Sequence, residues 1–227
     1  VRLDGDTVRI GAMTRQRAAE NDPIVASRLP LMKEALGWVG HLPTRSRGTI
    51  GGSIAHADPS AEMPMTVLAL DATLVAHGPK GERTIAADDF FDTFFTTALA
   101  SDEVLTEIRI PAMKAGAGYA VEEYARRKGD FAIVGITVVL EGAGGRCTRA
   151  RVTTAGIGGR PLRLRGVESL LEREAPSAAT FAEAARVARE SVEPTSDPNA
   201  SAEYRRHIAG VLTERALARA ASLMGQR

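Results

Sequence analysis

The chain has 227 residues, with 29 lysines and arginines against 28 aspartates and glutamates. This near-balance of charge argues against a nucleic-acid-binding protein, which normally carries a clear basic excess. Hydrophobic residues make up 44% and charged residues 25%, a composition that can bury a core. The most continuous apolar run, 131–140, is too short for a membrane helix, which needs ~20 residues.

The single cysteine, Cys147, excludes an internal disulfide and a cysteine-based metal site. The simplest interpretation is a reducing compartment, and we expect a cytoplasmic protein without a membrane span. A chain of this length fits one large domain or two small ones.

The first elements in chain order are a hairpin and two helices. Strand-like runs over 1–3 and 7–10 flank an Asp-Gly turn, which is a hairpin signal. Thr14 can cap a helix over 15–20, and Pro30 near a first helical turn predicts a second helix over 31–39. The segment 40–53, GHLPTRSRGTIGGS, is rich in Gly, Ser, Thr and Pro and predicts a loop.

A helix, a second hairpin and a single strand follow the loop. The helix is expected over 61–70, and runs at 73–77 and 83–85 flank a Gly-Pro-Lys-Gly turn. The strand is expected over 104–110. The small residues of 112–118 then mark a candidate domain boundary.

The second half changes to a sheet followed by helices. Three strand-like runs with short turns predict a three-stranded antiparallel sheet, at 119–127, 132–140 and 149–156. Three helical patterns predict a helical bundle, at 164–172, 180–191 and 202–224. We therefore expect an α+β fold in two domains, 1–112 and 113–227.

The most informative segment is Thr49-Ile50-Gly51-Gly52-Ser53. Adjacent glycines permit positive φ and a close approach of ligand. The flanking hydroxyls can donate to phosphate or ribityl oxygens, and successive backbone N–H groups can form an anion nest. Alone the motif is weak, because a Gly-Gly pair is more often a tight turn, and it matches neither the Walker loop nor the dinucleotide fingerprint.

The wider context is more specific. It comprises RSRGTIGGSIAHADPSAEMP, LALDATLVAHGPKGERTIAADDFF, VLTEIRIP, YARRKGDFAIVGITVVL and ASAEYRRHIAGVLTERAL. In these segments, which together cover essentially the whole chain, the sequence closely resembles the FAD-binding medium subunit of molybdenum hydroxylases. This family includes carbon monoxide dehydrogenase and xanthine dehydrogenase.

The resemblance implies an oxidoreductase subunit with FAD as its cofactor. Its partners would be a large subunit with the molybdenum cofactor and a small subunit with two-iron iron–sulfur clusters. Electrons would pass from these clusters through FAD to an external acceptor such as NAD, quinone or oxygen. No residue of this chain is expected to do acid–base chemistry on the substrate.

The resemblance also implies the cofactor-binding residues. Thr49, Ile50, Gly51, Gly52 and Ser53 look like a loop that contacts the FAD pyrophosphate. Further contacts are implied at the adenine end, at the flavin hydroxyls and at the isoalloxazine, by Val39, Glu62 and Leu105 respectively.

The chain departs from the family pattern at three places. Glu62 stands where the family usually has Asp, and Glu122 and Glu123 occupy a stretch where many relatives have Lys. The family's other FAD loop, A-G-G-x-S, is absent, and the chain reads as if it begins inside a hairpin at Val1. We therefore expect the FAD domain to lack its N-terminal subdomain here, and 50–70 further residues to precede Val1 by resemblance to the family.

Two alternatives stay open at this point. His56 and Asp58 in the AHADP segment can be a catalytic pair, although a role in capping and orienting the loop is favoured. The chain can also be a non-catalytic docking or scaffold subunit without bound flavin, which the missing loop favours and the intact TIGGS segment opposes.

Overall fold

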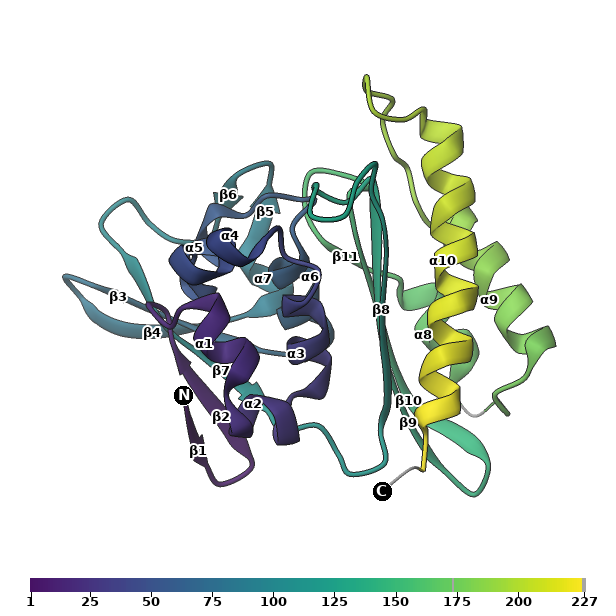
Figure 1. Cartoon of the computed structure of the whole chain (residues 1–227), viewed down its shortest axis with the longest axis horizontal. Coiled ribbons are helices and arrows are strands. Elements are labelled where there is room, and N and C mark those ends of the chain that lie inside the picture. The colour runs from purple at the N-terminus through teal and green to yellow at the C-terminus, as the bar shows by residue number, and fades with distance from the viewer. Residues whose placement is uncertain (173, 226–227) are drawn as a thin grey trace.

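The computed structural model describes residues 1–172 and 174–225 and shows a mixed α/β fold with two large antiparallel sheets and a small two-stranded one (Figure 1). The elements of the first half are β1 Arg2–Asp4, β2 Thr7–Gly11, α1 Gln16–Asn21, α2 Pro23–Arg28, α3 Pro30–Leu36, α4 Leu42–Arg47, α5 Ile50–His56, α6 Glu62–Ala69, β3 Thr73–Gly78, β4 Gly81–Ala86, α7 Ala87–Phe90, β5 Phe91–Thr93, β6 Thr96–Thr97 and β7 Val104–Pro111. Those of the second half are β8 Gly118–Tyr124, β9 Val134–Ala143, β10 Arg146–Ala155, β11 Leu162–Arg163, α8 Arg165–Leu171, α9 Ala178–Glu190 and α10 Ala202–Leu223.

The first sheet has the strand order β1-β2-β7-β3-β4, with every neighbouring pair antiparallel. Its centre is apolar: Ile108 pairs with Ile10 on one side and Leu74 on the other, and all three are fully buried. Both predicted hairpins and the predicted single strand are present in this sheet. The turn that leads from β2 to α1 therefore follows directly on a buried strand of this sheet.

The second sheet has four strands, in the order β11-β10-β9-β8. The predicted three-stranded meander is present as β8, β9 and β10, but the count of three was wrong. The two-residue strand β11 pairs with β10 through Thr153 and Thr154. A strand of two residues is too short to show an alternating pattern in the sequence. It forms only because β10 has a free edge to pair with.

The second sheet lies between two sets of helices (Figure 1). Helices α8 and α10 cover one face, with α9 packed on both of them, while α3 and α6 of the first half pack on the other face. Residues 134–140 of β9 are therefore buried without alternation, as expected for a strand covered on both faces. None of the helices within the described ranges has the length and apolar character needed to cross a bilayer.

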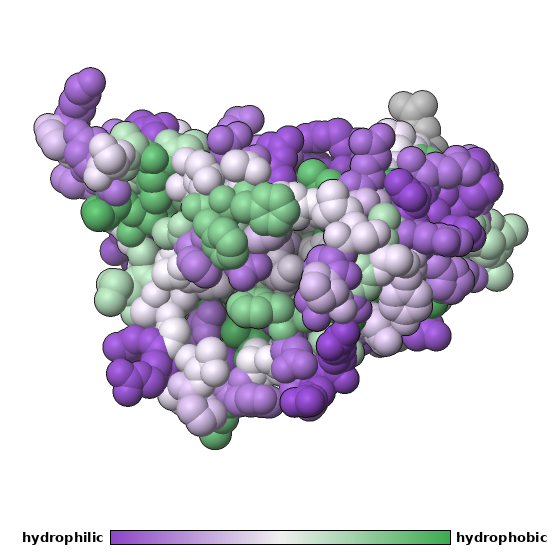
Figure 2. Space-filling view, turned by 90° about the horizontal axis from the view of Figure 1, so that it is seen from above, coloured by the Kyte–Doolittle hydropathy of each residue, from purple (hydrophilic) through white to green (hydrophobic). Residues whose placement is uncertain are grey.

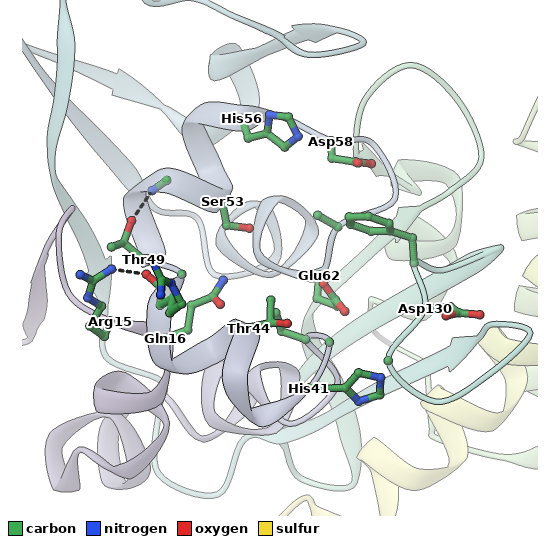
Figure 3. A pocket seen from close by; sticks show the side chains of 18 residues that line it. Arg15, Gln16, His41, Thr44, Thr49, Ser53, His56, Asp58, Glu62 and Asp130 are labelled. Carbon is green, nitrogen blue, oxygen red and sulfur yellow. Dashed lines mark hydrogen bonds between the residues drawn. The ribbon is translucent and has the colours of Figure 1, made fainter.

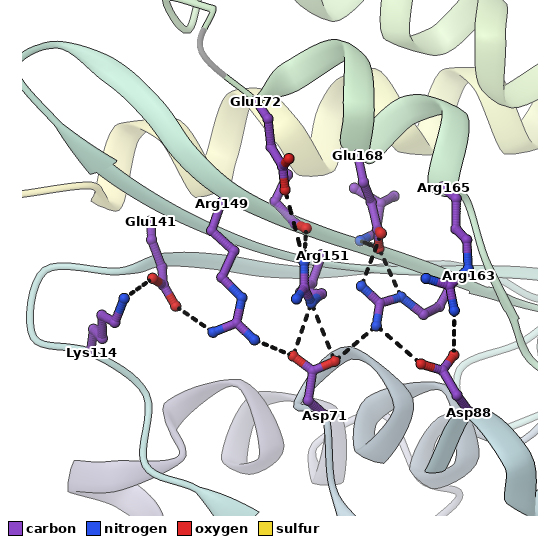
Figure 4. Close-up of polar contacts among 12 residues, drawn as sticks. Asp71, Asp88, Lys114, Glu141, Arg149, Arg151, Arg163, Arg165, Glu168 and Glu172 are labelled. Carbon is purple, nitrogen blue, oxygen red and sulfur yellow. Dashed lines mark hydrogen bonds and ion pairs between the residues drawn. The ribbon is translucent and has the colours of Figure 1, made fainter. Parts of the chain in front are cut away.

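Asp71 connects the two halves of the chain. It lies in the turn between α6 and β3, and its carboxylate accepts hydrogen bonds from Arg149 at 2.5 Å, Arg151 at 2.9 Å and Arg163 at 2.8 Å, all on the second sheet (Figure 4). Glu168 of α8 in turn accepts from Arg163. This ion-pair network crosses the contact between the halves and holds α6 against the second sheet.

The segment 40–53 is not the predicted loop, because it contains α4 and the first turn of α5. Thr49 is extended and its side chain caps α5 by accepting a hydrogen bond from the Gly52 N–H at 2.9 Å. Gly51 and Gly52 are helical rather than in the positive-φ region that we expected. Glycine is a poor helix former, so packing rather than local preference makes this segment helical.

Candidate functional site

A pocket of about 680 Å³ opens between the helices of the first half and the loop that precedes β9 (Figure 3). A volume of this size lies within the ~300–1,000 Å³ typical of ligand sites. The wall combines residues from α1, α4, α5, the start of α6 and the loop: Arg15, Gln16, Val39, Gly40, His41, Thr44, Arg47, Gly48, Thr49, Gly52, Ser53, His56, Asp58, Ala61, Glu62, Gly129, Asp130 and Phe131.

The glycine pair places α5 against the sheet. A Cβ on Gly51 would lie 2.4 Å from the Cβ of Ala12, so only glycine lets the two backbones approach this closely. The N–H of Ile50 donates to Thr14 and that of Gly51 to Ala12, each at 2.9 Å. The expected nest of free N–H groups is therefore absent, since these donors already hold the helix in place.

Hydroxyl groups are what this part of the wall presents to the pocket. Ser53 points its hydroxyl into the cavity from α5 (Figure 3). The Thr49 oxygen accepts the Gly52 N–H, which leaves its own hydrogen available as a donor. Gly52 lies exposed between them, and a Cβ there would lie 2.7 Å from the Thr49 Oγ1.

Glu62 is the buried acid of the pocket. It begins α6, has only 4% of its surface exposed, and projects toward the cavity (Figure 3). Burial raises the pKa of Glu62 to about 7, the neighbouring Asp58 carboxylate adds to the rise, and Arg45 offsets part of it. Ionising a buried carboxyl costs free energy because the charge loses its hydration. Hydrogen bonds donated by a ligand would offset that cost.

Five of the eight residues that the sequence designates line the pocket: Val39, Thr49, Gly52, Ser53 and Glu62. Ile50 and Gly51 are buried in α5 behind its wall. Leu105 lies on β7 and packs on the core of the first half rather than in the wall. The backbone carbonyl of its neighbour Thr106 accepts a hydrogen bond from the Ala12 N–H.

The structure separates the roles of His56 and Asp58. The Asp58 carboxylate accepts a hydrogen bond from the Ser60 N–H at 2.8 Å, which is the local turn role that the sequence favours. The His56 ring lies 5.1 Å from that of Phe95, centroid to centroid, and lines the pocket.

Sequence reasoning missed several wall residues, because their positions depend on contacts distant in the chain. Gln16 is buried, and its Oε1 has no hydrogen-bond partner among the described residues. His41 packs on Gly129, where a Cβ would lie 2.5 Å from the ring. Phe131, 62% exposed, belongs to the second half of the chain.

Two family models account for almost the whole chain. Residues 1–113 match the FAD binding domain in molybdopterin dehydrogenase, and residues 119–220 match the CO dehydrogenase flavoprotein C-terminal domain. The match therefore includes both the pocket wall of the first half and the second sheet with its helices.

Similar proteins share most of their length with this chain. The 6-hydroxypseudooxynicotine dehydrogenase complex subunit alpha of Paenarthrobacter nicotinovorans is 36% identical over 97% of this chain and 75% of that protein. The carbon monoxide dehydrogenase medium chain of Hydrogenophaga pseudoflava is 38% identical over 96% of this chain and 76% of that protein.

Solved structures resemble the fold closely. The carbon monoxide dehydrogenase structure from Hydrogenophaga pseudoflava matches with a TM-score of 0.97 and 38% identity, over 99% of this chain and 78% of that chain. Quinoline 2-oxidoreductase from Pseudomonas putida 86 matches with a TM-score of 0.93 and 35% identity, over 97% of this chain and 77% of that chain.

Fold and matches together define an oxidoreductase subunit with an FAD-binding domain. The chain belongs to the family of FAD-binding medium subunits of molybdenum hydroxylases, which includes the carbon monoxide and xanthine dehydrogenases. A docking subunit without flavin is not favoured, because the relatives are dehydrogenase subunits and the FAD-binding model covers the pocket.

The pocket residues fit an FAD molecule. The hydroxyls of Thr49 and Ser53 can donate to phosphate or ribityl oxygens, and Glu62 can accept from hydroxyls. The unpartnered Gln16 Oε1 is a further buried acceptor at the wall. Gly52 leaves open the space that a side chain would fill.

Proposed function

We propose that the pocket holds FAD and that Val39, Thr49, Gly52, Ser53 and Glu62 contact it directly. The observation that carries this proposal is the convergence of these five residues on one cavity from separate elements. Ile50 and Gly51 act behind the wall by fixing α5 against Ala12 and Thr14.

We also propose that residues 1–112 contribute one subdomain of the FAD-binding domain and residues 113–227 form the C-terminal domain. The change from the first sheet to the second at 111–118 supports this division. Both parts build the pocket, since Gly129, Asp130 and Phe131 line it opposite α4 and α5.

FAD, when bound, supplies redox chemistry by accepting and passing on electrons. The role of this chain is to bind and orient the cofactor and to shield one side of it. We propose that the chain assembles with a molybdenum-containing large subunit and a small subunit with two-iron clusters, and that NAD, quinone or oxygen is the final acceptor. The family membership supports this arrangement.

Filling the pocket tests the proposed function. Ser53→Trp places a large ring in the cavity, whereas Ser46→Trp places the same ring on the exposed surface of the neighbouring helix α4. We expect Ser53→Trp to lose most of its flavin and Ser46→Trp to keep it, as measured by the flavin-to-protein ratio of the purified protein. Equal flavin content in the two variants would overturn the assignment of this pocket.

A further inference from the structure

A buried amide lies at one end of the pocket. Gln16 is the first residue of α1, has only 3% of its surface exposed, and reaches toward the cavity (Figure 3). Its Oε1 has no hydrogen-bond partner among the described residues. Burying a polar group without a partner costs free energy, and an apolar side chain would fill the same place at a lower cost. Packing alone therefore does not explain an amide at this position.

The backbone fixes Gln16 beside the segment that contains Thr49. Arg15 and Thr49 form an isolated antiparallel bridge, and the N–H of Gln16 donates to the Gly48 carbonyl at 2.9 Å. A Cβ on Gly48 would lie 2.6 Å from the Gln16 Oε1, so glycine is what leaves room for the amide. Because the Oε1 faces the Gly48 backbone, the Nε2 end of the amide is the part that the cavity can reach. A ligand at this end of the pocket meets a hydrogen-bond donor.

Two arginine side chains join the amide at this end. Arg15 directly before α1 and Arg47 at the end of α4 both line the cavity. The Arg15 guanidinium donates to the Arg47 carbonyl, which holds the two segments together. Across residues 1–172 and 174–225 neither guanidinium forms an ion pair with a carboxylate, and Glu20 of α1 is paired with Arg17 and Arg45 instead. Two positive charges are therefore left for an anion.

The carboxyl groups of the pocket lie toward its other end. Glu62 begins α6, Asp58 precedes it, and Asp130 belongs to the loop before β9; Figure 3 shows Asp130 across the cavity from Arg15 and Gln16. A phosphate group is attracted by guanidinium groups and repelled by carboxylates. We therefore expect the anionic part of a ligand at the Gln16 end and a neutral part that carries hydroxyls at the Glu62 end.

The backbone near the glycine pair has few donors left for a phosphate. The N–H groups of Ile50, Gly51 and Gly52 all donate within the protein. Side chains must therefore supply most of the hydrogen bonds that a phosphate accepts. Guanidinium groups and primary amides suit this purpose, because each carries several N–H donors.

We propose that Arg15, Gln16 and Arg47, here called the anion subsite, bind the diphosphate group of a dinucleotide in this pocket. The Gln16 Nε2 donates to a phosphate oxygen from the buried wall, and the two guanidinium groups neutralise the charge of the diphosphate from the rim. The identity of the dinucleotide as FAD rests on the proposed function, whereas the subsite itself requires only a diphosphate.

Three variants that each lower the net charge by one unit test the anion subsite. Gln16→Glu replaces the donor with a carboxylate of similar shape, and Arg47→Gln removes a guanidinium group. Arg17→Gln is the matched control, because Arg17 lies on the exposed surface of α1 outside the pocket wall. We expect the dissociation constant for FAD to rise about tenfold or more in the first two variants and by no more than about twofold in the control. Equal FAD affinities in all three would overturn the subsite.

The melting transition of each variant shows whether the fold is kept. If Gln16→Glu does not fold, the exposed position of Arg47 still decides the proposal. Salt gives a readout that a purely structural role would not change. Added potassium chloride should weaken FAD binding by the wild type more than by Arg47→Gln, because fewer charges act in the variant. The same salt dependence in both would contradict a charge contact between Arg47 and the diphosphate.

Inorganic pyrophosphate distinguishes the anion subsite from the proposed function. It should raise the melting temperature of the flavin-free wild type and raise that of Arg47→Gln less. No rise in the wild type, or an equal rise in both proteins, would overturn the subsite. If pyrophosphate stabilises the protein in this way but FAD does not bind, the proposed function fails and the anion subsite stands. If FAD binds all variants equally, the pocket assignment stands and the subsite fails.

Discussion

At the scale of single residues, Gly52 has a clear physical requirement. A β-branched side chain at this position would collide with the Thr49 hydroxyl, which caps α5, and would project from the exposed face into the pocket. We expect Gly52→Val to lose most of its flavin while the fold survives, as checked by flavin content and the melting transition. Gly158→Val is the control, since a Cβ at Gly158 meets nothing within 4 Å. Full flavin occupancy in Gly52→Val would contradict the role of this position.

Glu62 also makes the stability of the flavin-free protein depend on pH. Its pKa is about 7 in the folded chain against the ordinary glutamate value of 4.5, so between these values the folded state holds a proton that the unfolded state has lost. The free energy of unfolding should therefore decrease as the pH rises through this window. At 1.36 kcal/mol per pKa unit, Glu62→Gln should be more stable than the wild type by up to about 3 kcal/mol near pH 8.

Urea denaturation at several pH values checks this expectation. The two proteins should be similar near pH 5, where the Glu62 carboxyl is largely protonated in the fold, and should diverge toward pH 8. A constant difference between them across the range would mean that Glu62 does not titrate in the fold near neutral pH.

At the scale of elements, α5 is set in place by its cap. Thr49→Ala removes the acceptor of the Gly52 N–H and should lower the free energy of unfolding by about 1 kcal/mol. Because the same hydroxyl faces the pocket, flavin affinity should fall as well. Ser201→Ala removes the corresponding cap of α10, where the serine accepts from the Tyr204 N–H at 3.1 Å.

The two cap variants distinguish helix stability from cofactor contact. Both should be destabilised to a similar extent in thermal or urea unfolding, but only Thr49→Ala should retain less flavin. Equal flavin binding by the two would show that Thr49 serves α5 alone.

At the scale of the whole molecule, Asp71 is the centre of the network between the halves (Figure 4). Its φ of 49° is left-handed, a conformation that Asn tolerates, so Asp71→Asn changes the charge with little backbone strain. Arg163, 6% exposed at its side chain, would lose an anionic partner. We expect a loss of roughly 2 kcal/mol in the free energy of unfolding.

A surface pair provides the control for this prediction. Asp4 pairs with Arg9 but is mostly exposed, so Asp4→Asn should change stability by no more than about 0.5 kcal/mol. Urea unfolding of both variants measures the loss of free energy of unfolding in each. A loss in Asp71→Asn no larger than that in Asp4→Asn would mean that the Asp71 network contributes little to holding the halves together.

The sequence alone predicted most elements, since alternation and helical spacing are local signals that survive in β7, β8, β9 and α10. It also designated five residues that share one pocket, because the segment around Thr49 is specific to a family whose fold this chain adopts.

Only the tertiary structure decided the rest. Residues 50–56 are helical against the preference of Gly51 and Gly52, because α5 packs on Ala12. The second wall of the pocket, with Gly129 and Phe131, comes from a strand connection far along the chain. Contacts of this kind depend on how the elements pack in space, and local sequence patterns report only on neighbours within a few residues.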